Sequence, residues 1–262
     1  MKIHPNSIIS KDAEIADDVE IGPFCAIVGK VKIGSGSKLI SHVSIGSEFG
    51  VVEIGKNNLF AAGCVVGGPP QDLKYKGEPT KLIMGDNNMI REMATINIGT
   101  PTGGGVTQLG SNCLIMAYVH IAHDCILGSN VVIANSTQLA GHVTIEDFAR
   151  IGGVCAINQF CRIGKFAFVA GDSAINKDII PYSMAQGRYA VIRATNRIGL
   201  ERAGYKKEDI ESVNRAIRIL TKGSSTVAEA LERIDKECPK SDALDYLLNF
   251  IRSSERGLAL VG

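Results

Sequence analysis

Aliphatic side chains recur at every sixth position along much of this chain. The longest unbroken series is Leu109, Ile115, Ile121, Leu127, Ile133, Leu139, Ile145, Ile151, Ile157, Ile163, Val169 and Ile175. A matching series opens the chain between Ile9 and Ile45. A period of six fits neither the 3.6-residue period of an α-helix nor the two-residue period of a simple strand. It therefore indicates a repeat architecture.

The aliphatic residue is commonly followed by a small residue, as at Gly22, Gly34, Gly128 and Gly164. This pairing is typical of a short strand that ends in a tight turn. Three such hexads make one triangular coil, and stacked coils make a parallel β-helix with an aliphatic stripe at each corner. Residues that are three hexads apart in the sequence are therefore expected to stack directly, about 4.8 Å from each other.

The sixfold pattern is interrupted three times, at 46–53, 67–80 and 99–108. Insertions into a solenoid emerge on one side and often form the wall of a binding site. We therefore predict three loops at these positions. They either line a substrate cleft or have no function of their own.

After Pro181 the apolar spacing becomes helical, over 210–220, 227–234 and 244–251. Signals for helix ends separate these segments: the capping box Thr226 with Glu229, and the helix breakers Gly204, Gly223 and Pro239. We predict a β-helix domain over residues 1–187 and a small α-helical domain over 188–262. The helical domain carries many positive side chains, which face either an acidic partner or solvent.

The bulk composition narrows the function. A net charge of +1 over 262 residues argues against a dedicated nucleic-acid surface. No apolar run is long enough to span a membrane, and no signal peptide is recognisable at the N-terminus. The seven cysteines are odd in number and form no C-x-x-C pair, which suits a reducing compartment. We therefore expect a cytoplasmic protein.

Three of the five histidines lie within the unbroken repeat, two of them in the segment YVHIAHDC. His123 next to Asp124 is a candidate general base, because the carboxylate stabilises the imidazolium formed on proton uptake. The three-hexad register places Gly141 above His123, His142 above Asp124 and Gln159 two coils above His123. A glycine amide can approach a ligand closely, as an oxyanion hole requires. The alternative is that these histidines only occupy solvent-facing positions.

Two rival chemistries use the same segment. A three-histidine zinc site of the kind that some β-helix enzymes hold would need a ligand at Tyr118, and His120 is poorly spaced from His123 for a strand. We therefore predict no metal. Cys125 is a conceivable nucleophile, but a small thiol is more simply an interior residue.

Several segments carry a family resemblance: QDLKYKGEPT, IREMATINIGT, HIAHDC, LAGHVTIEDFA, NQFCRIG and PYSMAQG. Together they resemble bacterial UDP-N-acetylglucosamine O-acyltransferases, the acyl-carrier-protein-dependent enzymes of lipid A biosynthesis, over essentially the whole chain. The resemblance implies a homotrimer of left-handed parallel β-helices with active sites between neighbouring subunits. It also implies no cofactor beyond the phosphopantetheine of the acyl carrier protein.

The resemblance also implies roles for individual residues. His123 matches the base that removes a proton from the 3-hydroxyl of the sugar, whose oxygen attacks the thioester of a 3-hydroxyacyl chain on acyl carrier protein. Asp124 matches the residue that orients this base, and the Gly141 amide matches the oxyanion donor. Substrate contacts are implied for Gln71, Asp72, Lys74, His120, His142, Gln159, Asn196 and Arg202.

Gly171 matches the residue that limits the length of the acyl chain, and a glycine leaves room for a longer chain, although Phe168 could narrow the slot. Positions that depart from the commonest family pattern are Asn97, Asn158, Ile198 and Ala203. They leave the sugar and nucleotide contacts open, including acceptance of a sugar nucleotide with an amine at C3. An acetyl-CoA-dependent hexapeptide acyltransferase and a noncatalytic scaffold are two further interpretations of the same repeats.

Overall fold

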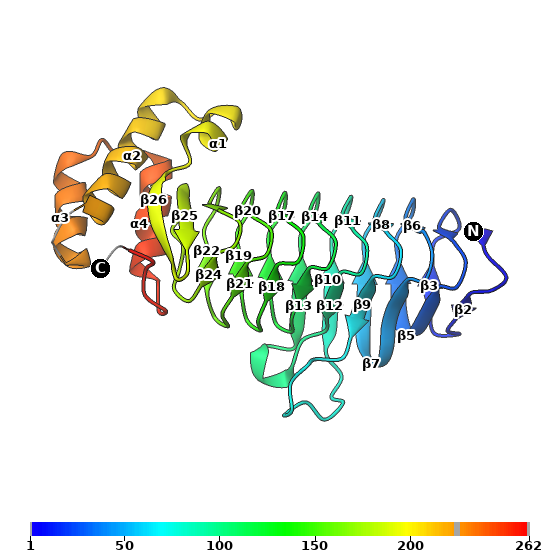
Figure 1. The fold of residues 1–262 in the computed structure, drawn as a ribbon. Coiled ribbons are helices and arrows are strands. Elements are labelled where there is room, and N and C mark those ends of the chain that lie inside the picture. The colour runs from blue at the N-terminus through cyan, green and yellow to red at the C-terminus, as the bar shows by residue number, and fades with distance from the viewer. Residues whose placement is uncertain (1, 223–225, 261–262) are drawn as a thin grey trace.

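The computed structural model describes residues 2–222 and 226–260. Most of these residues wind into a long β-helix, and four helices gather at its C-terminal end (Figure 1). This architecture confirms the expected fold class, a left-handed parallel β-helix followed by a small α-helical domain. Among the described residues, none of the helices has the length and apolar character needed to cross a membrane.

The β-helix has three faces built from parallel strands. Face 1 contains β2 (Ile8–Ile9), the first part of β5 (Ala26–Ile33) and of β7 (Ser44–Ile54), β9 (Val65–Gly68), β12 (Thr95–Asn97), β15 (His120–Ile121), β18 (Gln138–Leu139), β21 (Ala156–Ile157) and β24 (Ala174–Ile175). Face 2 contains β3 (Glu14–Ile15), the second part of β5 and β7, β10 (Lys81–Met84), β13 (Val106–Leu109), β16 (Ile126–Leu127), β19 (Thr144–Ile145) and β22 (Arg162–Ile163). Face 3 contains β1 (Lys2–Ile3), β4 (Glu20–Ile21), β6 (Lys38–Leu39), β8 (Leu59–Phe60), β11 (Met89–Ile90), β14 (Leu114–Ile115), β17 (Val132–Ile133), β20 (Arg150–Ile151), β23 (Phe168–Val169), β25 (Ser183–Gly187) and β26 (Ala190–Thr195).

The aliphatic series fills the interior of the β-helix. Ile121 pairs with Leu139 and Leu139 with Ile157, so the three-hexad register holds through this part of the chain. All three side chains are buried in one continuous core. Burying a side chain of this size contributes about 1.5–3 kcal/mol, so each coil is stabilised by its own aliphatic residues.

The three interruptions form loops, as predicted. Ser44 pairs with Val65, Val65 with Thr95, and Thr95 with His120, and each of these separations is longer than the three hexads of a regular coil. The extra residues all leave the β-helix at the corner between face 1 and face 2, which we call the insertion corner. Figure 1 shows the two longer loops projecting from the same side of the molecule, beside β10, β12 and β13.

The helical domain consists of α1 (Arg197–Arg202), α2 (Lys207–Lys222), α3 (Val227–Glu237) and α4 (Asp242–Arg252). The last three match the helical segments predicted from the apolar spacing. The capping box of Thr226 with Glu229 is present at the start of α3. Gly204 adopts a left-handed conformation just after α1, as expected at a helix end. Gly223, predicted to end a helix, lies outside the described residues.

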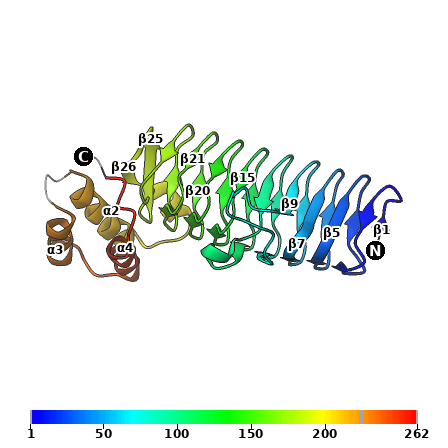
Figure 2. The same cartoon turned by 90° about the horizontal axis from the view of Figure 1, so that it is seen from below.

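The helices pack on the last coils of the β-helix, at the end opposite the N-terminus (Figure 2). Their core includes Phe166, Ile180 and Tyr182, which belong to the repeat region of the chain. The predicted boundary at residue 188 falls in the turn between β25 and β26, which pair in antiparallel fashion. The first helix starts only at Arg197, so the division at residue 188 stays a prediction.

Asp178 joins the end of the β-helix to the C-terminal segment. Its side chain is fully buried, and its carboxylate accepts hydrogen bonds from the Arg162 amide (2.8 Å) and the Ser254 hydroxyl (2.8 Å). Its backbone N–H donates to Gly257 O (2.8 Å), and its carbonyl accepts from Ala259 N–H (2.9 Å). One residue therefore connects three segments that are distant in sequence.

We expect Asp178→Ala to lower the free energy of unfolding by about 3 kcal/mol, because it leaves two partly buried donors without their charged acceptor. Chemical denaturation followed by circular dichroism measures the change. Asp172→Ala is the matched control, since this exposed carboxylate pairs with Arg188 at the surface and such pairs contribute about 0–1 kcal/mol. Equal losses in the two variants would contradict the assignment.

Candidate active site

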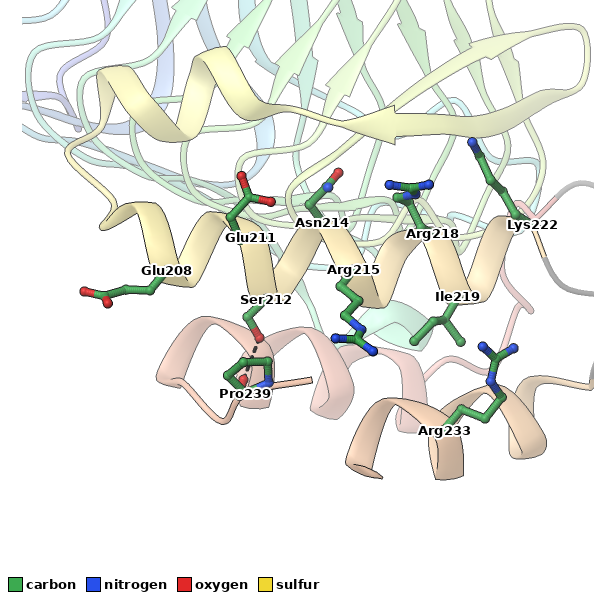
Figure 3. A pocket seen from close by; sticks show the side chains of 10 residues that line it. All are labelled: Glu208, Glu211, Ser212, Asn214, Arg215, Arg218, Ile219, Lys222, Arg233 and Pro239. Atoms are coloured by element: carbon green, nitrogen blue, oxygen red, sulfur yellow. Dashed lines mark hydrogen bonds between the residues drawn. The ribbon is translucent and has the colours of Figure 1, made fainter. Parts of the chain in front are cut away.

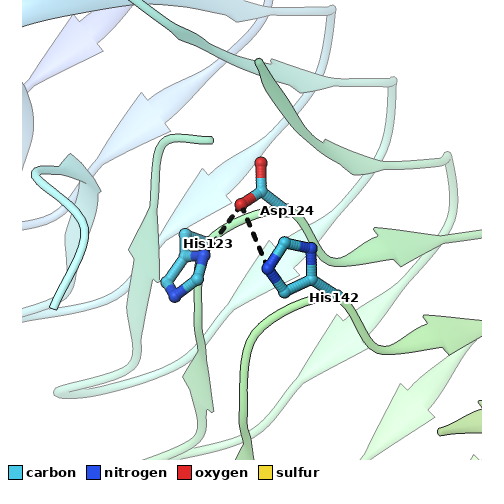
Figure 4. A group of neighbouring side chains, drawn as sticks. All are labelled: His123, Asp124 and His142. Atoms are coloured by element: carbon cyan, nitrogen blue, oxygen red, sulfur yellow. Dashed lines mark hydrogen bonds and ion pairs between the residues drawn. The ribbon is translucent and has the colours of Figure 1, made fainter. Parts of the chain in front are cut away.

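His123 and Asp124 occupy the turn between β15 and β16, at the insertion corner. Asp124 has a left-handed backbone (φ 60°), which aspartate tolerates better than most residues. The side chain of Asp124 is 0% exposed and that of His123 is 13% exposed, and Nδ1 of His123 lies 2.8 Å from Oδ2 of Asp124 (Figure 4). Because a carboxylate only accepts hydrogen bonds, Nδ1 of His123 is the donor and Nε2 is left as the acceptor. This is the tautomer that a general base needs.

The Asp124 carboxylate is held by a residue that the sequence analysis did not single out. Thr100 donates its amide to Oδ1 (2.8 Å) and its hydroxyl to Oδ2 (2.6 Å). The Asp124 amide donates to Thr107 Oγ1 (2.8 Å). Thr100 belongs to the third insertion, so the repeat register gave no signal for its position.

Gly141 lies directly against the His123 ring, as the three-hexad register predicts. A Cβ at Gly141 would be 2.6 Å from Cε1 and 2.9 Å from Nε2 of His123. The Gly141 amide donates no hydrogen bond to another described residue, and Gly141 lines a cavity beside His123. An unpaired amide next to the acceptor nitrogen is able to stabilise an oxyanion.

Two further histidines surround this pair. The His142 ring stacks on Phe160 (4.4 Å between centroids), and its Nε2 lies 3.8 Å from Oδ2 of Asp124. Burial lowers the pKa of His142 below its usual value, although the Asp124 carboxylate opposes this shift. Burial also lowers the pKa of His120, and the neighbouring His123 lowers it further. Both rings are therefore neutral at neutral pH.

Thr95 fixes the orientation of the His120 ring. Its Oγ1 lies 2.7 Å from Nδ1 of His120, on the strand one coil below. This contact leaves Nε2 of His120 as the nitrogen available to a ligand. His120 lines the same cavity as Gly141, so it is placed to contact whatever binds beside His123.

Two cavities flank His123. The first lies over face 1 and is lined by predicted site residues Gln71, His120, His123, Gly141 and Gln159, and by Asn158. The second lies under the loop of the 67–80 insertion and is lined by Gln71, Asp72, Leu73, Lys74, Thr102, His123, His142, Gln159 and Phe160. The structure therefore brings nine of the twelve predicted site residues to one place. Eight of them line these two cavities, and the ninth, Asp124, lies behind His123.

The remaining three predicted residues lie elsewhere. Asn196 and Arg202 line a separate cavity between α1 and face 3, together with Ile198 and Ala203. The Asn196 side chain caps α1 through Gly199 N–H (3.1 Å) and donates to the carbonyl of Phe166 (2.9 Å). Gly171 lies at the corner between face 3 and face 1 and lines neither the two cavities beside His123 nor the cavity of Asn196.

Asn97, one of the departures from the family pattern, is buried below the first cavity. Its Nδ2 donates to the carbonyl of Pro69 (3.0 Å), so it holds the start of the 67–80 insertion. Its Oδ1 has no hydrogen-bond partner among the described residues. Asn158, the other departure on this side, is exposed and lines the first cavity.

The same geometry bears on the rival chemistries. His123, Asp124 and His142 present ligand atoms within 4.8 Å of one another. Oδ2 of Asp124, the oxygen that faces His142, however, already accepts two hydrogen bonds, so a metal bound to it would have to displace Thr100 or His123. Cys125 lies in the β-helix core, where burial raises the pKa of its thiol to about 12. A thiol so seldom ionised is a poor nucleophile.

A further cavity lies between α2 and α3 (Figure 3). It is lined by the cations Arg215, Arg218, Lys222 and Arg233 and by the acids Glu208 and Glu211. Arg215 and Arg233 both pair with Glu237 outside the cavity lining. The charge of this surface is thus partly neutralised within the domain, and the choice between an acidic partner and a solvated face stays open.

The chain is similar over nearly its whole length to several named proteins. Residues 178–259 match the family described as "Udp N-acetylglucosamine O-acyltransferase; Domain 2", and residues 107–141 match bacterial transferase hexapeptide repeats. The acyl-[acyl-carrier-protein]--UDP-N-acetylglucosamine O-acyltransferase of Thermodesulfovibrio yellowstonii is 46% identical over 257 residues, 98% of each chain. The protein of the same name from Saccharophagus degradans is 45% identical over 256 residues, again 98% of each chain. The crystal structure of UDP-N-acetylglucosamine O-acyltransferase from Moraxella catarrhalis matches with a TM-score of 0.94 at 40% identity, over 99% of this chain and 100% of that one.

Proposed function

The chain belongs to the UDP-N-acetylglucosamine O-acyltransferase family, and we propose that His123 is the general base of its reaction. The protein transfers an acyl chain from acyl carrier protein to UDP-N-acetylglucosamine, the activity for which its relatives over 98% of the chain are named. The observation that carries the proposal is the buried Asp124–His123 pair, whose free Nε2 faces Gly141 at the edge of a cavity.

The residues around this pair account for each proton in the transfer. The sugar 3-hydroxyl loses its proton to Nε2 of His123 as its oxygen attacks the thioester carbonyl of a 3-hydroxyacyl donor. The oxyanion that forms accepts a hydrogen bond from the Gly141 amide, while Asp124 stabilises the imidazolium. When the carbon–sulfur bond breaks, His123 returns the proton to the departing thiolate of the carrier protein. The products are the ester and the free thiol.

The residues expected to contact substrate fall on both sides of the base. Gln71, Asp72 and Lys74 form the wall on the side of the 67–80 insertion. His120 and Gln159 line the cavity over face 1. The acyl chain is carried on the phosphopantetheine of acyl carrier protein, and the proposed transfer uses no other cofactor. A cytoplasmic location is supported by the seven cysteines, all buried as free thiols.

We infer a homotrimer whose active sites lie between neighbouring subunits. Support comes from a column of apolar residues on the corner between face 3 and face 1. Phe24, Met93, Tyr118 and Val154 lie in turns of this corner, and each is half or more exposed. This corner separates the cavity of His123 from the cavity of Asn196. A second copy packed on it would bring the helical domain of one subunit toward the base of another.

Gly171, at the same corner, is the proposed limit of the acyl chain. A Cβ there would lie 3.2 Å from the Gly153 carbonyl, so that carbonyl must shift by a few tenths of an ångström, and the backbone is not left-handed. We expect Gly171→Met to shift the preference toward shorter chains, with kcat/KM for the longest accepted donor falling about fourfold for each methylene that no longer binds.

A panel of carrier-protein thioesters of increasing length tests both the function and the limit on chain length. Wild type, Gly171→Met and the control Lys32→Ala, an exposed residue of face 2, are assayed with UDP-N-acetylglucosamine, with its 3-amino analogue and with acetyl-CoA as a competing donor. Turnover with acetyl-CoA alone would contradict the proposed donor, and preference for the 3-amino analogue would correct the acceptor. An unchanged length profile in Gly171→Met would remove Gly171 as the limit.

A further inference from the structure

The turn at 99–105 closes over the Asp124 side chain and leaves it no exposed surface. Thr100 is buried, and its amide and hydroxyl both reach the Asp124 carboxylate, at 2.8 Å and 2.6 Å. A Cβ on Gly103 would overlap that carboxylate, so the turn fits only with a glycine there. The turn is thus packed directly on the group that supports His123.

The hydrogen bonds to Asp124 show what the Thr100 hydroxyl does. Each carboxylate oxygen has two lone pairs. On Asp124, Oδ2 accepts from the Thr100 hydroxyl and from Nδ1 of His123. Nε2 of His142, a competing donor in the tautomer that carries its proton there, lies 3.8 Å from the same oxygen. Because both lone pairs of Oδ2 are occupied, this oxygen keeps its hydrogen bond to His123 and is not available as an acceptor for His142.

Thr100 itself is held rigidly. Its carbonyl accepts from the amides of Gly103 (3.1 Å) and Gly105 (2.9 Å). The residue before it is fixed from the other side, because the buried hydroxyl of Thr80 donates to the Gly99 carbonyl (2.6 Å). Thr100 lines neither cavity beside His123, so it does not touch a bound substrate.

We propose that Thr100 is a positioning residue for the reaction, acting on His123 through the Asp124 carboxylate. This inference rests on the proposed role of His123 as the base. The Thr100 hydroxyl holds Oδ2 in the orientation that fixes the Nδ1–H tautomer of His123 and keeps Nε2 directed at the acceptor. The turn at 99–105 is therefore part of the catalytic apparatus as well as a wall of the cleft.

The test is Thr100→Val, which keeps the shape of the side chain and the hydrogen bond from the backbone amide to Oδ1 of Asp124 but removes the hydroxyl. Since a hydrogen bond to a charged group is lost, we expect kcat to fall about 10- to 100-fold. The KM values for UDP-N-acetylglucosamine and for the acyl donor should stay near those of the wild type, because Thr100 touches neither substrate. Thr100→Ser, which restores the hydroxyl, should recover most of kcat. Thr100→Ala gives the same test should the valine variant fold poorly.

Thr80→Val is the matched control, because it removes a buried hydroxyl that holds the same turn without contacting Asp124. It should lower the unfolding temperature while keeping kcat within about threefold of the wild type, as expected for a loss of stability alone. A fall in kcat as large as that of Thr100→Val would show that the turn only needs to be intact, and would overturn the inference. A wild-type kcat in Thr100→Val would overturn it as well.

A double-mutant cycle with Asp124→Ala identifies the path of the effect. If Thr100 acts through Asp124, Thr100→Val causes no further loss in the Asp124→Ala background. Independent, multiplying losses would contradict the proposal. An active His123→Ala variant would overturn the proposed base, and this inference with it. An inactive His123→Ala beside a fully active Thr100→Val would overturn this inference alone.

Discussion

We expect the replacement of His123 with alanine to lower kcat by about 10²- to 10⁴-fold, the range that a positioned general base supplies. The loss follows because the variant retains the cavity and the oxyanion donor but has no group to take the proton from the acceptor hydroxyl. The KM values change much less, since the loop residues Gln71 to Lys74 and the face-1 residues His120 and Gln159 still line the cleft.

The fold of this variant should persist, because Asp124 keeps both hydrogen bonds from Thr100. Circular dichroism and size-exclusion chromatography establish that the variant has the wild-type structure before its rate is measured. His4→Ala is the matched control, an exposed histidine in the first coil whose side chain accepts one hydrogen bond among residues 2–222 and 226–260, from the Asn6 amide. Near wild-type turnover by His123→Ala would show that another group is the base.

Replacing Gly141 with alanine is expected to lower kcat by about 10²- to 10³-fold, comparable to the loss of an oxyanion donor. The added methyl group would lie 2.6 Å from Cε1 and 2.9 Å from Nε2 of His123. The buried Asp124 lies behind the ring and the centroid of the His142 ring is 5.2 Å away, so the ring can move only toward the two cavities. The ring must therefore turn away from the acceptor or break its hydrogen bond to Asp124.

Gly153→Ala is the control for a general effect of the substitution. Gly153 occupies the equivalent turn position at the corner between face 3 and face 1, where a Cβ would be 3.1 Å from the Asn135 carbonyl and far from the histidines. Steady-state rates of the two variants, measured on proteins with matched unfolding temperatures, separate a local collision from a loss of stability. Equal rates in the Gly141→Ala and Gly153→Ala variants would mean that the contact between Gly141 and His123 does not contribute to catalysis.

Much of the site was predictable because the repeat converts distance along the chain into position. Once three hexads make one coil, Gly141 must stack on His123 and His142 on Asp124, and the structure has these contacts. The three interruptions were equally visible. Those at 46–53 and 99–108 shift the phase of the aliphatic series, and that at 67–80 puts Asp72 and Glu78 where aliphatic residues are due. Their common exit at the insertion corner follows from the same count.

Other parts were not accessible from the pattern. The short helix α1 buries only Leu200, so it has no apolar period to detect. Thr100 went unnoticed because it lies in an insertion, where the three-hexad register no longer says what stacks on what. The placement of Asn196 on the far side of the corner from His123 depends on how the helical domain packs, which local spacing does not encode.

The sequence by itself determined the β-helix, its register and the residues that stack at the insertion corner, because these depend on backbone pairing repeated at a constant interval. Only the tertiary structure decided how the 99–105 turn folds back onto Asp124 and commits its carboxylate to His123. That outcome depends on hydrogen bonds between Thr100 and Asp124, which lie in segments well separated along the chain. Such contacts produce no repeating pattern in the sequence, because the insertion that makes them is not part of the repeat. Its conformation is set only when it packs against the next coil of the β-helix.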